Sequence, residues 1–276
     1  MIKPVTNRST IDIRRQNDLS RDIARLQVEV STGKKLLAPS DDPVASAQVA
    51  NIRRAQANDS AWNKAIDLGS AKAAQADTVL KSVSDRLARA QELTIAGASD
   101  SSSPADRATI AHELRNIATE IDDLAETQDS QGGQLFATGS ALQFRFGENA
   151  VFAPVPSKAE AFSPGGVSYS SILNDAATAL ESGNRPQIDA ALASIKTGIG
   201  SAADVAGDLG IRAARIDNLR ESHLSRSIDF AAERSVLEDT DLSEAIATLN
   251  SKLTTLEAAQ LTFGRINRRT LFDILN

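Results

Sequence analysis

The chain has 276 residues, of which 41% are apolar, 24% charged and 4% aromatic, and it contains no cysteine. The absence of cysteine excludes disulfide scaffolds, thiolate metal sites and cysteine nucleophiles, and the net charge of −6 argues against nucleic acid as a partner, because phosphate binding needs a basic surface. No run approaches the ~20 consecutive apolar residues that a bilayer requires, so no membrane partner is expected, and the scarcity of aromatic residues favours long helices packed through Leu, Ile, Val and Ala.

Residues 1–40 are expected to form an N-terminal helix with one narrow apolar stripe. The apolar side chains fall largely at steps of three and four residues, and the pattern ends near Gly33. Residues 1–35 also carry eight basic and four acidic side chains, whereas the middle of the chain is acidic. The stripe consists of Ile13, Leu19, Ile23, Leu26 and Val30.

The next segment is a turn bounded by two prolines, Pro39-Ser40-Asp41-Asp42-Pro43. Proline prevents continuation of the helix, and Asp42 is placed to cap a new helix that has Pro43 at its first position. Between residues 44 and 96 the apolar pattern continues without proline, and about 50 helical residues would span roughly 75 Å at ~1.5 Å per residue. This length predicts an elongated helical body.

Another helix is expected to begin at Ser103. This serine is followed by Pro104 and, three positions after the cap, by Asp106, which is the pattern of a capped helix start. The helix should run to about Asp129. Residues 97–102 would then form the turn of an antiparallel helical hairpin.

Residues 137–170 differ in composition from the rest of the chain. They are rich in glycine, proline and phenylalanine, and residues 142–146 alternate between apolar and polar, which predicts a small β-rich insert of hairpins and loops. The helical pattern then resumes from Ile172 to about Ala206 in two short pieces, broken near residues 183–186. A long helix is expected to follow, from about Leu209 to Leu237.

The last helix is expected after residues 239–241, whose aspartates can cap it. Its apolar side chains alternate at four and three residues over about four repeats, which is typical of a coiled-coil seam. The seam consists of Leu242, Ile246, Leu249, Leu253, Leu256 and Phe263, and the apolar residues Leu271, Phe272 and Leu275 follow it.

Together these elements predict a mainly α fold, a long antiparallel helical bundle or coiled-coil rod with a small β-rich insert. The expected division is an N-terminal assembly helix at residues 1–40, a first part of the rod at 41–136, the insert at 137–170, a second part of the rod at 171–240, and a C-terminal assembly helix at 241–276.

The two terminal helices each need a partner to be stable. Burial of the six seam side chains of the last helix would gain about 9–18 kcal/mol, whereas the backbone entropy of some 30 ordered residues costs more than that. If the two ends pair, the final apolar residues would still be exposed, which usually marks an assembly surface. We therefore expect both ends to be unstructured in the single chain, to fold against neighbouring subunits, and to form the assembly interface through the stripe, the seam and the final apolar residues.

No pattern of catalytic, cofactor-binding or metal-ligating residues is present. His112 begins a zinc-helix motif but Asn116 stands where the second ligand would have to be, and Gly33 lacks the neighbours of a phosphate loop. His223 has no ordering typical of a Ser-His-Asp triad, and the paired acids at 41–42 and 122–123 fit a cap and an exposed helix face. We expect neither a cofactor nor enzymatic activity.

Three stretches resemble the flagellar axial proteins, the superfamily that contains flagellin and the hook-filament junction proteins. The stretches are Ser31-Thr32-Gly33-Lys34-Lys35 with residues 39–45, residues 106–114 with 132–137, and residues 239–258 with the ending Leu271-Phe272-Asp273-Ile274-Leu275. The two prolines of the first stretch favour a junction protein over filament flagellin.

The resemblance implies a structural subunit of the bacterial flagellum that joins hook to filament. It implies that the terminal helices line an inner tube, with an adjacent hook-associated protein, flagellin and other copies of the chain as partners. It also implies an extracellular place in the flagellum, type III export without a cleaved signal peptide, and a cytosolic export chaperone. A filament-forming flagellin is the alternative, and a helical module that binds a lipid surface or an anionic polymer is a further one, suggested by the basic ends.

Overall fold

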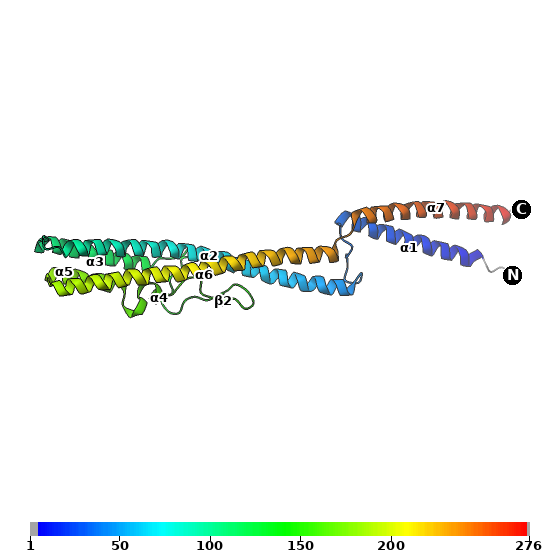
Figure 1. Ribbon diagram of the computed structural model, residues 1–276. Coiled ribbons are helices and arrows are strands. Elements are labelled where there is room, and N and C mark those ends of the chain that lie inside the picture. Colours follow the sequence, from blue (N-terminus) through cyan, green and yellow to red (C-terminus); the bar gives the residue numbers. More distant parts are fainter. Residues whose placement is uncertain (1–4, 275–276) are drawn as a thin grey trace. The chain divides into compact units, whose positions relative to one another are not determined.

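The structure is a computed structural model that describes the backbone of residues 5–274 and the side chains of residues 10–265. In chain order the helices are α1 (Val5–Thr32), α2 (Pro43–Gly97), α3 (Pro104–Ala125), α4 (Lys158–Phe162), the 3₁₀ turn η1 (Pro164–Gly166), α5 (Tyr169–Ser182), α6 (Arg185–Glu238) and α7 (Leu242–Ile274) (Figure 1). The strands β1 (Phe144–Arg145) and β2 (Val151–Phe152) pair antiparallel, with Phe144 opposite Phe152 and Arg145 opposite Val151. The fold is mainly α, as expected.

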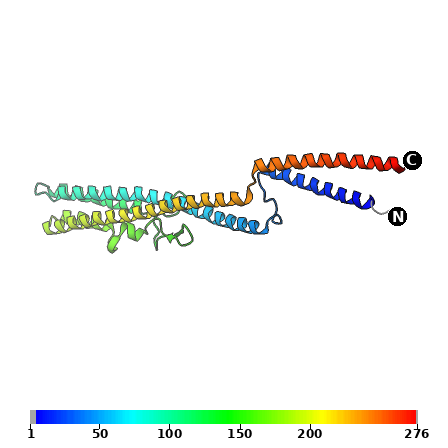
Figure 2. The same cartoon turned by 45° about the vertical axis from the view of Figure 1, so that its right-hand side comes forward.

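The chain forms two compact units, one of residues 1–56 with 227–276 and one of residues 57–226. Helices α2 and α6 contribute residues to both. In the first unit, α1 and α7 lie side by side in both views of the molecule (Figures 1 and 2). In the second unit, α3 and α5 pack against the long helices. No helix among the described residues has the length and hydropathy needed to cross a bilayer.

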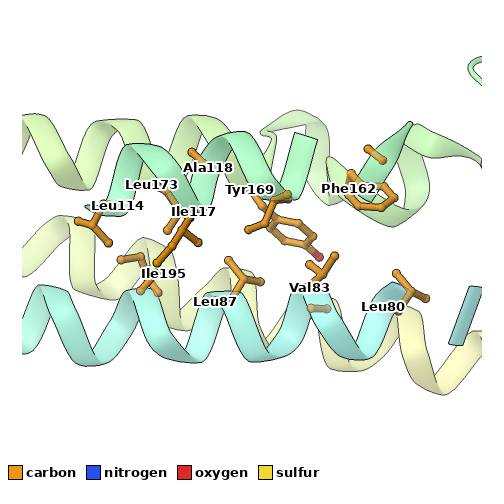
Figure 3. Close-up of a cluster of buried hydrophobic side chains, with 14 of the residues drawn as sticks. Leu80, Val83, Leu87, Leu114, Ile117, Ala118, Phe162, Tyr169, Leu173 and Ile195 are labelled. Atoms are coloured by element: carbon orange, nitrogen blue, oxygen red, sulfur yellow. The ribbon is translucent and has the colours of Figure 1, made fainter. Parts of the chain in front are cut away.

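The core of the second unit is built from four helices and almost entirely from aliphatic side chains. In α2 the core positions Leu80, Val83 and Leu87 follow the spacing of one helix face, and they meet apolar residues of α3, α5 and α6 (Figure 3). Alanines between the larger side chains let the helices approach closely. The partners shown in Figure 3 include Leu114, Ile117, Ala118, Tyr169, Leu173 and Ile195.

Three of the helix starts expected from the sequence are confirmed. Ser103 and Asp106 form a reciprocal capping box at the start of α3, with Pro104 in the first turn. The Asp42 carboxylate accepts hydrogen bonds from the amides of residues 44 and 45, and that of Asp241 accepts from residues 243 and 244. At the end of α1, Gly33 has a φ of 70°, which only glycine adopts readily.

Two features differ from the sequence-based expectation. The break predicted between residues 206 and 209 is absent, because α6 continues from Arg185 to Glu238. Gly207 and Gly210 lie in open space, since an added Cβ would have no neighbour within 4 Å. Glycine weakens a helix, but these two do not interrupt the apolar face of α6, on which Leu209 and Ile216 are buried. The insert has strands of only two residues each, and loops, α4 and η1 make up most of the rest.

Phenylalanines within the insert and directly before it hold the insert against the helices in two places. Phe136 and Phe162 meet edge to face, with ring centroids 5.0 Å apart, and belong to the four-helix core. Phe146 is fully buried with Ile66 of α2 and Ile216 of α6. The insert is therefore anchored by aromatic burial rather than by an extended sheet.

Gly69 of α2 makes a close approach to the insert possible. A Cβ at this position would lie 2.7 Å from the ring of buried Phe146, so Gly69→Ala should lower the free energy of unfolding by about 1–3 kcal/mol. Gly207→Ala, in open space on α6, should instead raise it by about 0.5–1 kcal/mol, because alanine favours helix. Urea unfolding followed by circular dichroism measures both variants, and equal effects would contradict the assigned contact.

Candidate assembly interface

Helices α1 and α7 pair antiparallel through the predicted stripe and seam. An ion pair joins Lys252 Nζ to Asp22 Oδ2 at 2.5 Å across the pair. Ile23 is the most buried residue of the α1 stripe, with 6% of its surface exposed. The other seam residues that the pairing half-buries are Leu19, Leu26, Val30, Leu249, Leu253, Leu256 and Phe263.

Three predicted interface residues lie outside this intramolecular seam. Ile13, Leu242 and Ile246 keep 47%, 47% and 44% of their surface exposed. At the start of α7, Ala245 is buried, with 5% of its surface exposed. A heptad count that considers only large apolar residues misses it. The side chains of Leu271 and Phe272, and all of Leu275, lie outside the described residues.

The pair of helices leaves an open apolar groove. Its volume is about 440 Å³, and it lies between the N-terminal half of α1 and the C-terminal half of α7. Leu19, Ala258, Ala259 and Phe263 provide apolar walls, and Asp12, Arg15, Gln16, Thr255 and Thr262 complete the lining. Two helices alone therefore do not close this surface.

Further large apolar side chains point away from the seam. Ile11 and Val28 of α1 are each 45% exposed and Leu261 of α7 is 67% exposed. The sequence analysis did not single out these residues, because they do not follow the stripe of either helix. The sequence could have identified them as the large apolar residues of the two helices that belong to neither the stripe nor the seam.

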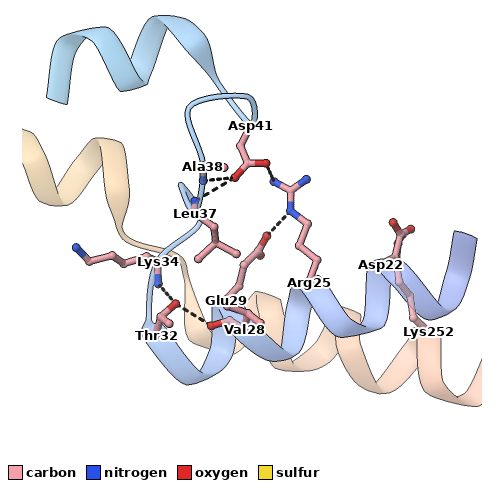
Figure 4. A network of polar contacts seen from close by, with 10 residues as sticks. All are labelled: Asp22, Arg25, Val28, Glu29, Thr32, Lys34, Leu37, Ala38, Asp41 and Lys252. Atoms are coloured by element: carbon pink, nitrogen blue, oxygen red, sulfur yellow. Dashed lines mark hydrogen bonds and ion pairs between the residues drawn. The ribbon is translucent and has the colours of Figure 1, made fainter. Parts of the chain in front are cut away.

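The turn between α1 and α2 is held by its two aspartates. The Asp41 carboxylate accepts hydrogen bonds from the amides of Ala38 at 2.8 Å and Leu37 at 3.1 Å, and it lies 3.5 Å from the Arg25 guanidinium (Figure 4). The bond from the Ala38 amide is the main cause that lowers the pKa of Asp41. Asp42 caps α2, while Pro39, Ser40 and Pro43 are exposed.

Buried Glu238 ties three segments of the first unit together. Its carboxylate accepts from Lys34 Nζ at 2.9 Å and from the Arg53 guanidinium at 2.6 Å, and only 4% of its side chain is exposed. Its carbonyl accepts from the Lys35 amide at 2.8 Å, and the Thr240 amide donates to the Gly33 carbonyl at 3.0 Å. The Lys34 hydrogen bond is the largest cause that lowers the pKa of Glu238.

The stabilising effect of Glu238 should therefore depend on pH. Because the folded state lowers its pKa below 4.5, the stabilisation is present above that pH and is lost as the pH falls through the folded-state value. Glu238→Gln should reduce the free energy of unfolding at pH 7 by about 1–2 kcal/mol and flatten the decline of stability below pH 4.5. Glu233→Gln, exposed on the same helix, is the control. Parallel acid profiles for the wild type and Glu238→Gln would contradict this role.

The structure places the two histidines that the sequence analysis weighed in different surroundings. His112 is exposed on α3. His223 is buried, and its ring nitrogens face a carboxylate of Asp59 and the carbonyl of Phe146. Within the described part of the chain, no cluster of three His, Cys, Asp or Glu side chains is arranged to hold a metal ion.

The chain is similar to known flagellar proteins. Residues 6–141 match the family model of the bacterial flagellin N-terminal helical region. Flagellar hook-associated protein 3 of Salmonella typhimurium is 25% identical over 291 residues, covering 91% of this chain and 92% of the relative, and that of Escherichia coli is 23% identical over 287 residues, covering 89% and 90%.

A solved structure shares the fold. The flagellar junction protein FlgL from Legionella pneumophila superposes with a TM-score of 0.58 at 14% identity, covering 70% of this chain and all of that chain. The chain thus has a mainly α fold, and its residues 6–141 are similar to the N-terminal helical region of bacterial flagellin. Over about nine-tenths of its length the chain is similar to these two hook-associated proteins 3.

Proposed function

We propose that this chain is a structural subunit of the bacterial flagellum that joins hook to filament, and that it assembles by coiled-coil packing of α1 and α7 with neighbouring subunits. The match over about nine-tenths of hook-associated protein 3 supports the junction role. The observation that carries the assembly mode is the unfinished α1/α7 pair, with an open groove on one side and exposed apolar residues on its outer faces.

Packing explains why a third partner is needed. Two helices bury only the faces that they turn toward each other, so side chains such as Ile11 and Leu261 remain in water. Covering one such side chain fully gains about 1.5–3 kcal/mol. Several of them, repeated in every subunit of a ring, would supply a substantial part of the association energy.

The partners that fit this surface are helices with the same kind of apolar face. They would be other copies of this chain, the adjacent hook-associated protein and flagellin. The proposed work is mechanical, through packing between neighbours, and needs no catalytic group.

The exposed apolar surface of α7 also has a consequence for export. A chain that assembles outside the cell must keep α7 from associating too early, so we include in the proposal a cytosolic chaperone that covers α7 and secretion without a cleaved signal peptide. The exposed Leu261 and the apolar wall of the groove support the need for such a cover.

Deletion of the gene tests the junction role. Electron microscopy of the deletion strain should show hooks without filaments and flagellin released into the medium, and the wild-type gene supplied in trans should restore filaments. Normal filaments on the deletion strain would overturn the proposal.

A filament-forming flagellin is the second candidate, because the matched family model is that of flagellin itself. The purified chain distinguishes the two. Polymerisation of the chain alone into long filaments would favour flagellin, and failure to polymerise without other axial proteins would favour a junction subunit.

A further inference from the structure

A buried polar layer joins α2, α6 and the insert at His223. The residue is 1% exposed, and Asp59 of α2 is 2% exposed. His223 Nδ1 lies 3.2 Å from Asp59 Oδ1, and Nε2 lies 2.8 Å from the carbonyl oxygen of Phe146. The Trp62 ring covers the imidazole, with ring centroids 5.5 Å apart.

Both partners of the imidazole are hydrogen-bond acceptors. A carbonyl oxygen only accepts, and an ionised carboxylate only accepts, whereas a neutral imidazole has a single N–H. Both contacts are satisfied only when the Asp59–His223 pair holds one more proton than an ionised aspartate beside a neutral histidine. That proton sits either on the second ring nitrogen or on the carboxyl group, and in both cases it lies between the two residues.

Loss of this proton would leave one of the two buried acceptors, the Asp59 carboxylate or the Phe146 carbonyl, without a donor from His223. Asp59 Oδ2 is buried and has no hydrogen-bond partner among the described residues. The remaining cation at Asp59 is Arg226 of α6, whose NH1 is 3.4 Å from Oδ1 and whose side chain is 43% exposed. A buried acceptor pair without a shared proton costs free energy, because water cannot replace the missing donor.

The contact to Phe146 connects this layer to the insert. The Phe146 amide donates to the Ala150 carbonyl at 2.8 Å, which closes the hairpin between β1 and β2. The next residue, Gly147, packs directly on the imidazole, since a Cβ there would lie 3.6 Å from Nε2. The charged groups at the imidazole are therefore Asp59 from α2 and, through it, Arg226 from α6, while the insert contributes backbone.

We propose that a proton shared by Asp59 and His223 latches the insert hairpin onto α2 and α6, so that the hairpin loosens as rising pH removes the proton. This inference concerns the insert and does not depend on the terminal helices.

Hydrogen exchange of the full-length chain tests the latch. Amide protection of residues 144–152, corrected for the intrinsic exchange rate, should fall roughly tenfold between pH 5 and pH 8.5, as expected for one lost hydrogen bond, while that of α4 stays constant. Equal protection of the hairpin at the two pH values would overturn the proposal.

Two substitutions separate the shared proton from simple packing. In Asp59→Asn the amide group can donate to Nδ1 of a neutral His223 while Nε2–H donates to Phe146, so the hairpin should stay protected at both pH values. His223→Gln should loosen it at both, and His112→Gln should behave as the wild type. An Asp59→Asn variant that keeps the wild-type pH dependence would contradict the proposal.

The wild-type chain gives a reading that needs no variant. It contains only two histidines, so the imidazole ¹⁵N spectrum shows His223 beside the exposed His112 as an internal reference. At pH 5, both ¹⁵N signals of His223 should be those of hydrogen-bonded nitrogens. Neither should have the shift of a nitrogen with a free lone pair. A His223 ring that shows a free, unbonded nitrogen at pH 5 would overturn the proposal even if His223→Gln fails to fold.

Discussion

Leu114→Ala is expected to lower the free energy of unfolding by about 2–5 kcal/mol, the largest stability loss predicted for this chain. Leu114 of α3 is fully buried in the core that α2, α3, α5 and α6 share. Because neighbouring helices are held on several sides, they cannot collapse into the space that the side chain leaves. The loss therefore includes a cavity as well as the transfer of apolar groups.

Leu224→Ala is the matched control for this experiment. It makes the same substitution in a helix, α6, at a position that is 61% exposed, and it should change stability by less than about 0.5 kcal/mol. Urea unfolding monitored by circular dichroism gives both values. A similar loss in the two variants would mean that burial in the core of the second unit does not determine the effect.

Local signals allowed most of the helices to be predicted. Ser103 with Asp106, Asp42 with Pro43, and Asp241 each act on amides within three residues, so the sequence alone contains both partners of the interaction. The aliphatic core follows from the spacing of residues such as Leu80 and Leu87 along one helix. The predicted break in α6 failed because glycine permits a turn but does not enforce it when the flanking apolar face stays buried.

Contacts between distant residues could not be predicted. Lys34 and Glu238 are 204 residues apart, and Asp59 and His223 are 164 apart, so neither pair leaves a periodic signal. The sequence around His223 does not reveal that the residue is buried, because its partners come from α2 and the insert. The expectation that the ends are unstructured in the single chain also differs from the structure, where α1 and α7 pair and half-bury each other's seams.

That partial pairing changes where an assembly contact should be sought. Seam residues such as Ile23 are already buried within the subunit, so their substitution would disturb the folding of the subunit itself. Leu261 on the outer face of α7 keeps 67% of its surface exposed, so it contributes little to packing among the described residues. A substitution there separates assembly from folding.

Leu261→Asp is therefore expected to abolish filament attachment while leaving the purified subunit folded. Leu261 is 67% exposed on α7, so a carboxylate is well hydrated in the monomer but would be buried without a partner in an apolar contact between subunits. The helix content by circular dichroism should match that of the wild type. Swimming in soft agar and filaments seen by electron microscopy should both be lost.

Gln260→Asp, at the adjacent exposed position, adds the same charge and the same cost in helix propensity without removing an apolar side chain. It should retain filaments, because a polar residue there has no apolar contact to lose. If both variants swim normally, the outer face of α7 is not an assembly surface, and the groove beside Phe263 would have to supply the contact. If both fail, charge near the end of α7, and not apolar packing by Leu261, controls assembly.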